Sequence, residues 1–196
     1  MNVILLVIAY LLGSLPFGYL MSKYFLKTDI RKHGSGNIGA TNVLRVGGWK
    51  AALPVFLLDA LKGFAAVYLA KYFSDLPEIF LAAGFLAMLG HSFPIFLKFK
   101  GGKAAATGVG VLAAVSGWAL LILVVITVIL IGTTRYVSLG SIVGSMLVPL
   151  IFLILGYDLS YIIFGIGVAI LVVLRHRQNI ERLLKGTESK LGSKKS

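Results

Sequence analysis

Among its 196 residues the chain has no cysteine and only three histidines, and Asp and Glu together number 7 against 19 Lys and Arg. The absence of cysteine excludes disulfide bonds and thiol chemistry. The histidines lie far apart in the sequence, which argues against a metal site. Charged residues make up 13% of the chain and hydrophobic residues 58%, whereas a soluble domain carries about 25% charged residues. The composition therefore indicates an integral membrane protein.

Apolar segments recur along the whole chain, and a run of about 20 apolar residues matches a bilayer core about 30 Å thick. They lie at about 2–22, 53–70, 78–97, 104–116, 118–133, 139–155 and 160–174. The region 104–133 would be about 45 Å long as one helix, too long for an untilted span, yet each half is short of a span if it divides at Ser116-Gly117. We predict an all-α, polytopic membrane helix bundle of seven helices, with two short helices or a re-entrant hairpin at 104–133.

The net charge of +12 would suggest a nucleic-acid partner in a soluble protein, but the positions of the charges have a simpler explanation. Of the 19 Lys and Arg residues, 17 lie in the first, third and fifth loops and the tail. The other two are Lys62, inside an apolar segment, and Lys71, in the second loop. The positive-inside rule places the first, third and fifth loops and the tail in the cytoplasm. We predict an N-terminus outside, a C-terminus in the cytoplasm and no nucleic-acid partner. Residues 1–185 would form a single membrane-embedded domain, and the polar tail 186–196 is expected to fray.

The first polar motif, Gly34-Ser35-Gly36-Asn37-Ile38-Gly39, formally matches the G-x-G-x-x-G pattern of dinucleotide-binding folds. That pattern must follow a β-strand, whereas this one follows the polar stretch 28–33, so the dinucleotide fold is rejected. Closely spaced glycines still allow backbone N–H groups to turn inward together and bind an anion. Further donors for a phosphate come from Ser35, Gly36, Asn37, Thr41, Asn42 and Arg45. The alternative is a flexible loop with a helix cap at Thr41 or Asn42.

Two further motifs suit anions. Gly101-Gly102-Lys103 precedes a helix expected from Ala104, and a helix N-terminus favours anions. Near the end of the last apolar segment, His176 and Asn179 would share one helix face. The simpler alternatives are positive-inside charge with a glycine turn for the first motif and a basic membrane-edge anchor for the second. By the charge rule all three motifs are cytoplasmic, where together they would line a positive pocket suited to phosphates.

Ionisable residues inside apolar segments are costly and suggest a function. Asp59 and Lys62 are three residues apart and can pair, either as a structural ion pair or within the site, where Asp59 would orient a cation. His91 precedes Pro94, which breaks the helix, and a buried histidine bonded to backbone is the favoured interpretation. Ser141 follows a helix start expected at Ser138 and would point into the bundle.

In this order and spacing, the motifs resemble those of the bacterial PlsY family, the acyl-phosphate:glycerol-3-phosphate acyltransferases. The resemblance covers about residues 10–188 and rests on Ser35–Asn42, Leu58–Gly63, His91–Thr107, Arg135–Ser141 and Arg175–Leu183. Each segment alone is weakly specific, whereas all of them in order are highly specific. One departure follows Lys103, where the family usually has glycine and this chain has Ala104. A lost glycine would stiffen that turn but leaves the lysine in place.

The resemblance implies an enzyme of the bacterial inner membrane with a site on the cytoplasmic side. It would transfer a fatty acyl group from acyl phosphate to the 1-hydroxyl of glycerol 3-phosphate, giving lysophosphatidic acid and phosphate, the first step of phospholipid synthesis. Its partners would be these two substrates and the lipid bilayer, with no cofactor or metal, and no oligomeric state is indicated. A membrane transporter of a phosphorylated solute is the alternative, but it would place its binding groups near mid-membrane rather than at one face.

Both substrates of that reaction carry phosphate, so their mutual repulsion has to be overcome. Lys103 and Arg45 would grip the phosphates, and backbone N–H groups near Gly36 and Gly102 would stabilise developing negative charge. The expected phosphate-binding residues are Gly36, Asn37, Thr41, Asn42, Arg45, Gly101, Gly102 and Ser141, with Asp59, Lys62 and His91 in supporting roles.

The acceptor hydroxyl must lose a proton, and His176 is the obvious base by residue type, held by Asn179. A substrate phosphate could take the proton instead, which would leave His176 only to bind. A covalent acyl-serine at Ser35 lacks a paired base nearby in the sequence. The expected catalytic residues are His176, Lys103, Ser35 and Asn179.

Overall fold

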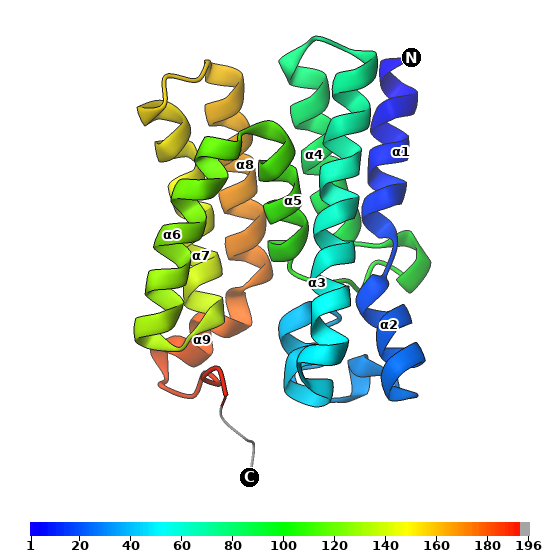
Figure 1. Ribbon diagram of the computed structural model, residues 1–196, viewed down its shortest axis with the longest axis vertical. Helices are drawn as coiled ribbons and strands as arrows, with labels where there is room; N and C mark the ends of the chain where they lie inside the picture. Colours follow the sequence, from blue (N-terminus) through cyan, green and yellow to red (C-terminus); the bar gives the residue numbers. More distant parts are fainter. Residues whose placement is uncertain (193–196) are drawn as a thin grey trace. The chain divides into compact units, whose positions relative to one another are not determined.

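A computed structural model describes residues 1–192, and this part of the chain contains helices and connecting segments but no β-strand. The helices are α1 Asn2–Ser14, α2 Phe17–Leu26, η1 Ile30–Lys32, α3 Ala40–Phe73, α4 Pro77–Ser92, η2 Ile95–Leu97, α5 Ala105–Val115, α6 Gly117–Thr134, α7 Val137–Ile154, α8 Leu159–Arg175 and α9 Arg177–Leu184. They form two compact units, Met1–Val115 and Ser116–Ser196, called units 1 and 2 below. The all-α prediction is confirmed (Figure 1).

In unit 1, α1 packs against α4, and α3 packs against both α4 and α5. A Cβ atom on Gly110 of α5 would overlap the Ala60 carbonyl of α3, so glycine lets these two backbones touch. The segments 27–39 and 93–104 both lie in the half of this unit away from the N-terminus, with 27–39 at its tip and 93–104 nearer its middle (Figure 1). We call this half the loop end of unit 1. One apolar cluster joins the two segments there, because Ile38 of the first belongs to it and Leu97 of the second packs against it.

Helix α3 begins at Ala40, well before the apolar segment expected from residue 53. Its first part carries Asn42, Arg45 and Lys50, polar residues that an apolar run excludes. Gly48 then interrupts the helix with φ +72° and ψ −174°, a conformation that essentially only glycine adopts. The resulting kink sets the direction in which the first turns of α3 carry Asn42 and Arg45.

In unit 2, α7 packs against both α6 and α8. The Ser116 hydroxyl caps α6 by accepting the Ala119 N–H at 3.1 Å, and it pairs with the Tyr157 hydroxyl at 2.8 Å. Helix α9 leaves α8 at an angle of 63°, with His176 between them. The turn after α6, helix α9 and the residues that follow α9 lie at one end of this unit (Figure 1), called the α9 end.

The count of seven helices is wrong, because residues 1–192 contain nine α-helices. The first expected helix divides into α1 and α2 at Leu15-Pro16, where proline cannot donate a backbone hydrogen bond. The bend at His176 separates α9 from α8. Each of the seven apolar segments nevertheless forms helix, and the division of 104–133 into two helices at Ser116 is confirmed.

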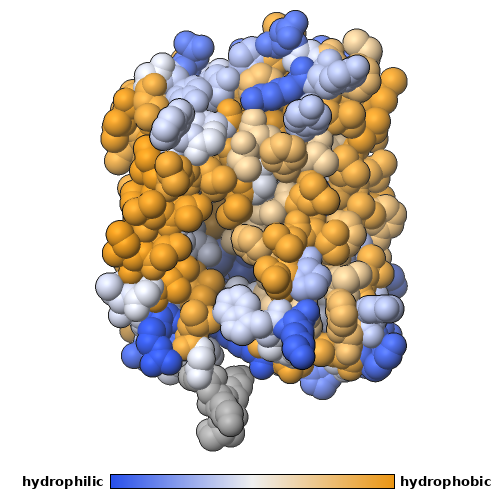
Figure 2. Space-filling view, viewed as in Figure 1, coloured by the Kyte–Doolittle hydropathy of each residue, from blue (hydrophilic) through white to orange (hydrophobic). Residues whose placement is uncertain are grey.

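Within residues 1–192, five helices are long and apolar enough to span a membrane, with α1 and α2 counted as one. Helices α8 and α9 add a sixth if the bent pair is one span. Helix α5, with 11 residues, is only about 16 Å long, about half of a bilayer core. Figure 2 shows apolar side chains over the middle of the helices and polar ones toward their ends. Large apolar side chains such as Trp118 and Ile129 are exposed, which suits contact with lipid.

Candidate functional site

The segment between η1 and α3 is held from within by the amide of Asn42. Its Oδ1 accepts the Ser35 N–H at 2.8 Å, and its Nδ2 donates to the carbonyls of His33 at 3.0 Å and Asn37 at 2.8 Å. The residue is buried, with 2% of its surface exposed. Both ends of this amide are thus committed to backbone. We infer that Asn42, expected to contact phosphate, serves by ordering the backbone of this loop.

The same segment leaves other donors at the surface. Gly36 has φ +71°, and the Asn37 side chain accepts the Gly39 N–H at 2.8 Å, just before α3 begins. Among the expected site residues here, the exposed ones are Ser35, Gly36 and Arg45, and the half-buried ones are Asn37 and Thr41. The loop end of unit 1 therefore presents hydroxyl, backbone and guanidinium donors, the groups that bind phosphate oxygens.

The second motif connects η2 to α5 and lies against the end of α4. The Gly102 N–H donates to the His91 carbonyl at 3.0 Å, and Gly102 is buried whereas Gly101 and Lys103 are half-buried. Helix α5 begins at Ala105, so Lys103 lies just before a helix N-terminus, where backbone N–H groups and the helix dipole favour an anion. The expected order of glycine turn, lysine and helix is confirmed.

Ala104 stands where the PlsY pattern has glycine, and the structure shows what this costs. Its φ is +59°, in the left-handed region that costs a residue with a Cβ about 1–2 kcal/mol, whereas glycine adopts it readily. Ala104 is fully buried, so packing holds the turn after Lys103 in this conformation.

A buried ion pair lies inside unit 1. Lys62 Nζ is 2.9 Å from Asp59 Oδ1, and it donates to the Leu15 carbonyl at 2.7 Å, at the break between α1 and α2. His91 Nδ1 lies 3.5 Å from the same Asp59 oxygen, so this buried histidine faces a carboxylate rather than only backbone. Buried charges persist only when they are paired. The structure therefore contains the ion pair that the spacing of Asp59 and Lys62 indicated.

In unit 2 the third motif surrounds the bend between α8 and α9. His176 lies at the bend, so the continuous helix assumed for this motif is wrong. The His176 ring is buried and its Nδ1 lies 2.8 Å from the Val172 carbonyl. Because a carbonyl oxygen only accepts, Nδ1 carries a proton, and in a neutral ring Nε2 would be the accepting nitrogen. The Asn179 N–H donates to the His176 carbonyl at 2.8 Å, so the two residues remain neighbours.

Glu188 supplies the carboxylate of this motif, and sequence analysis missed it. Its Oε1 accepts hydrogen bonds from Asn179 Nδ2 at 2.7 Å and the Ser138 hydroxyl at 2.8 Å, and its Oε2 accepts one from Arg182 Nε at 2.7 Å. The only signal in the sequence is a single acidic residue beyond α9 in a lysine-rich tail. Spacing along the chain does not show which residues such a side chain will meet.

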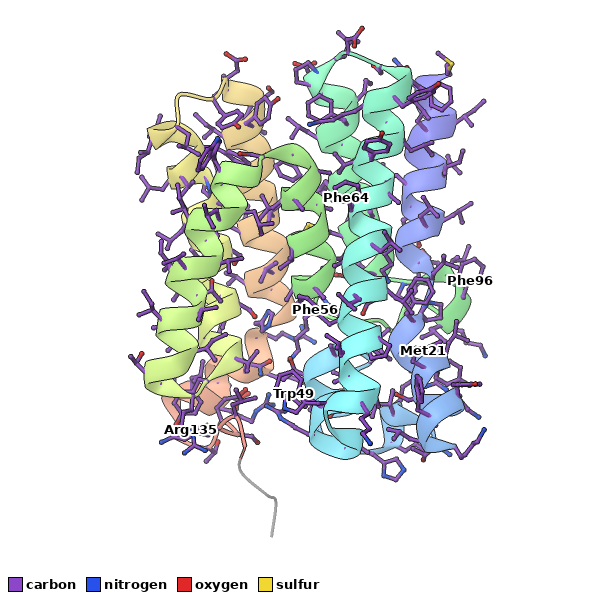
Figure 3. The ribbon with its side chains drawn as sticks, viewed as in Figure 1. Met21, Trp49, Phe56, Phe64, Phe96 and Arg135 are labelled. Atoms are coloured by element: carbon purple, nitrogen blue, oxygen red, sulfur yellow. The ribbon has the colours of Figure 1, made fainter. Side chains whose placement is uncertain are left out.

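The tail after α9 folds back and does not fray over residues 186–192. The Leu191 N–H donates to the Arg135 carbonyl at 2.7 Å, and the Arg135 guanidinium donates to the Leu191 carbonyl at 2.9 Å. Arg135 lies at the turn between α6 and α7 (Figure 3). These two bonds hold the tail, and with it Glu188, at the α9 end of unit 2.

The predicted site residues fall into two groups. The group in unit 1 consists of Ser35, Gly36, Asn37, Thr41, Asn42, Arg45, Asp59, Lys62, His91, Gly101, Gly102 and Lys103. The group in unit 2 consists of Ser141, His176 and Asn179, and the half-buried Ser141 bonds to the Val137 carbonyl at 3.1 Å. A pocket made by all three motifs stays a prediction.

The Glu188 contacts predict an acid-sensitive fold. Burial alone would raise the pKa of Glu188, but the hydrogen bonds from Arg182, Asn179 and Ser138 outweigh it and hold this pKa below the ordinary 4.5. A lowered folded-state pKa means that the stabilisation is fully present above about pH 4.5 and is lost as pH falls through the folded-state pKa. Glu188→Gln should lower the free energy of unfolding at pH 7 by about 1.5–3 kcal/mol and flatten its fall below pH 4.5.

Thermal unfolding of the purified protein between pH 3 and 7 measures this effect. Glu181→Gln is the matched control, because Glu181 forms an exposed pair with Lys185 at 2.6 Å, and exposed pairs contribute about 0–1 kcal/mol. Equal losses in the two variants would show that the Glu188 contacts contribute no more than a surface pair.

Comparison with known proteins places the chain in a family. A model of the family glycerol-3-phosphate acyltransferase matches residues 3–186. The glycerol-3-phosphate acyltransferase of Thermoanaerobacter pseudethanolicus is 50% identical over 188 residues, covering 96% of this chain and 94% of that protein. That of Carboxydothermus hydrogenoformans is 46% identical over 197 residues, covering 100% of both chains.

Two crystal structures of PlsY, an integral membrane glycerol 3-phosphate acyltransferase, are also similar. Its glycerol 3-phosphate form has a TM-score of 0.92 and 41% identity, covering 97% of this chain and 96% of that one. Its lysophosphatidic acid form has a TM-score of 0.90 and 40% identity, covering 97% and 95%. The chain, a multi-pass membrane protein, therefore belongs to the PlsY family of glycerol-3-phosphate acyltransferases.

Proposed function

We propose that this protein transfers a fatty acyl group from acyl phosphate to the 1-hydroxyl of glycerol 3-phosphate, at the cytoplasmic face of a bacterial inner membrane. The bond between the acyl carbon and the phosphate oxygen breaks, and an ester bond to the glycerol oxygen forms. The hydroxyl proton passes to the departing phosphate, either directly or through His176. The products are lysophosphatidic acid and inorganic phosphate, and the reaction is the first step of phospholipid synthesis.

The observation that carries this proposal is the similarity to PlsY over nearly the whole chain. PlsY is described in a glycerol 3-phosphate form and in a lysophosphatidic acid form, which are the acceptor and the product of the proposed reaction. The donor, acyl phosphate, is the one implied by the resemblance of the motifs around Ser35, Lys103 and His176 to those of the PlsY family.

The residues at the loop end of unit 1 suit the phosphates. Lys103 and the N–H groups at the start of α5 would stabilise the charge of the leaving phosphate. Arg45, with its planar fork of donors, suits a second phosphate, and Ser35 with the backbone at Gly36 adds neutral donors. Because acyl phosphate is already activated, holding the two anions together is the main task of the protein, and positioning alone can lower the barrier by several kcal/mol.

The residues at the α9 end of unit 2 suit the glycerol hydroxyls. Because its Nδ1 bonds to the Val172 carbonyl, a neutral His176 ring would use Nε2 to accept a hydroxyl hydrogen of the substrate. Asn179 is held by Glu188 at 2.7 Å and in turn supports the His176 carbonyl through its N–H. We propose that both groups of residues act in the same reaction.

The acyl chain needs an apolar surface that begins near the phosphate-binding residues. Trp49, Phe56 and Phe64 follow one another along α3 from the loop end of unit 1 (Figure 3). Their side chains are exposed, although large aromatic residues usually bury most of their surface in a water-soluble fold. We propose that the acyl chain of the donor contacts this side of α3.

The direct test combines the purified protein with palmitoyl phosphate and glycerol 3-phosphate and detects lysophosphatidic acid by mass spectrometry. We expect this product and an equal amount of inorganic phosphate. Parallel reactions replace palmitoyl phosphate with palmitoyl-coenzyme A. Product from the coenzyme A ester alone would overturn the proposed donor, and no product from either would overturn the proposed reaction. Activity in detergent, where no compartments exist, would also separate the enzyme from a transporter.

The proposed orientation makes its own prediction. Because 17 of the 19 cations lie in the first, third and fifth loops and the tail, we expect the C-terminus to lie in the cytoplasm. Alkaline phosphatase fused to the C-terminus, which works only in the periplasm, should be inactive, whereas a fused green fluorescent protein should fluoresce. An active phosphatase fusion would place the tail outside and remove the basis for a cytoplasmic site.

A further inference from the structure

A buried polar cluster in unit 1, formed by Asp59, Lys62 and His91, connects α1, α3 and α4. Lys62 bonds to the Leu15 carbonyl at the α1–α2 break and pairs with Asp59 on α3. His91, at the end of α4, faces Asp59 at 3.5 Å. The three side chains are almost fully buried, with 1% to 4% exposed. Of the three, His91 lies against Gly102, the residue that precedes Lys103.

The imidazole of His91 lies between Asp59 and the Gly101-Gly102 turn. On one side its Nδ1 faces Asp59 Oδ1. On the other side a Cβ atom added to Gly102 would overlap His91 Nε2, and one added to Gly101 would overlap the His91 carbonyl. The Gly102 N–H donates to that same carbonyl at 3.0 Å. The ring and the backbone of His91 therefore set how closely the turn approaches α4.

Contacts with the helices also hold the cluster in place. Asp59 is held by Lys62, and Lys62 is held by the Leu15 carbonyl, so the carboxylate that faces His91 cannot move without breaking a buried pair. The turn itself has little freedom to relax, because Ala104 after Lys103 is fully buried at φ +59°. A displacement of about 1 Å in a binding group can cost about 100-fold in rate.

We propose that His91, oriented by Asp59, is a positioning residue that sets the place of Lys103 through the Gly101-Gly102 turn. This inference rests on the proposed role of Lys103 in binding a substrate phosphate. A merely structural His91 would affect how much protein folds and how stable it is, but not the KM or kcat of the folded enzyme. A positioning His91 changes the kinetics of the folded enzyme and does so through Lys103.

Two substitutions separate the two contacts of the ring. His91→Phe keeps an aromatic ring against Gly102 but removes the nitrogen that faces Asp59, and His91→Asn keeps a short polar donor but leaves space beside Gly102. We expect either variant to lose about 10- to 100-fold in kcat/KM for palmitoyl phosphate while it still unfolds cooperatively. Tyr10→Phe is the matched control, because it removes a 2.8 Å hydrogen bond to the Phe93 carbonyl at the same end of α4 and should keep wild-type kinetics.

The decisive measurement combines each His91 variant with Lys103→Ala. Residues that act through one group show non-additive losses, so we expect the second substitution to cost less than about 3-fold more. The positioning role would be overturned if the fold-losses of the two single variants multiplied in the double variant. It would also be overturned if the His91 variants kept the wild-type KM and kcat. A Lys103→Ala enzyme with wild-type kinetics would instead overturn the proposed function of Lys103.

A substitution in the turn rather than in His91 tests the same contact if both His91 variants fail to fold. Gly102→Ala would press a methyl group against His91 Nε2 and should produce the same non-additive loss with Lys103→Ala. Gly117→Ala, where an added Cβ meets nothing within 4 Å, is its control and should be active. Equal activity of the two glycine variants would overturn the proposal.

Discussion

Lys103→Ala is expected to lower kcat/KM by about 30- to 1000-fold while the protein stays folded, because a lost charged hydrogen bond in a closed site costs about 2–4 kcal/mol. Lys103 is half-buried, follows a turn in which Gly102 is bonded to α4, and precedes the N-terminus of α5. The helix N-terminus and the lysine would then act on one phosphate. Steady-state kinetics with both substrates and thermal unfolding of the same preparation measure the effect.

Lys100→Ala is the control for ordinary positive-inside charge. Lys100 lies three residues before Lys103 in the same loop, but it is exposed. A charge that only sets the orientation in the membrane has no specific contact to lose, so we expect a loss of less than about 3-fold, within the few tenths of a kcal/mol typical of surface substitutions. Equal, mild losses at both positions would show that Lys103 has no role beyond membrane orientation.

His176→Ala is expected to raise the KM for glycerol 3-phosphate by about 5- to 150-fold and to leave the acidic limb of the pH–rate profile in place. The size corresponds to a substrate hydroxyl left without its hydrogen-bond partner in a closed site, about 1–3 kcal/mol. This is the result for a His176 that binds, with the proton passing to a substrate phosphate. A general base would instead show a fall in kcat of about 100- to 10,000-fold, unchanged affinity and no acidic limb.

The surroundings of His176 favour the binding role. A general base is usually oriented by an acid, but His176 Nδ1 bonds to the Val172 carbonyl. The acids nearby have other partners, because Glu188 accepts from Asn179, Ser138 and Arg182 and Glu181 pairs with Lys185. Gln178→Ala, at an exposed position two residues away, is the control and should keep wild-type kinetics. Loss of the acidic limb with unchanged affinity in His176→Ala would overturn this assignment.

The sequence alone was sufficient for the features that the membrane imposes locally. An apolar segment must form helix in lipid, because no water satisfies its backbone, so all seven segments could be located from hydropathy. The division at Ser116 could be inferred from the length of the apolar region 104–133, and Ser116 does cap α6. The motifs at Ser35, Lys103 and His176 are contiguous, so their order along the chain sufficed for the family.

The tertiary structure decided what depends on residues far apart in the chain. Asn42 was expected at a phosphate, but three hydrogen bonds to its own loop place its amide inside. Glu188 meets Ser138 across 50 residues, which spacing and periodicity do not encode. Hydropathy did not show that α3 begins at Ala40. An apolar run ends where the helix leaves the lipid, but the backbone hydrogen bonds of the helix continue into its polar part.

The buried cluster illustrates the same division. The interval of three residues between Asp59 and Lys62 indicated their pairing, since both lie on one helix. That Lys62 also reaches the Leu15 carbonyl, and that Asp59 also faces His91 beside Gly102, depends on how α1, α3 and α4 pack. Local sequence determines which residues are available on a helix face, whereas the packing of helices determines which of them meet, because contacts across the chain depend on three-dimensional proximity.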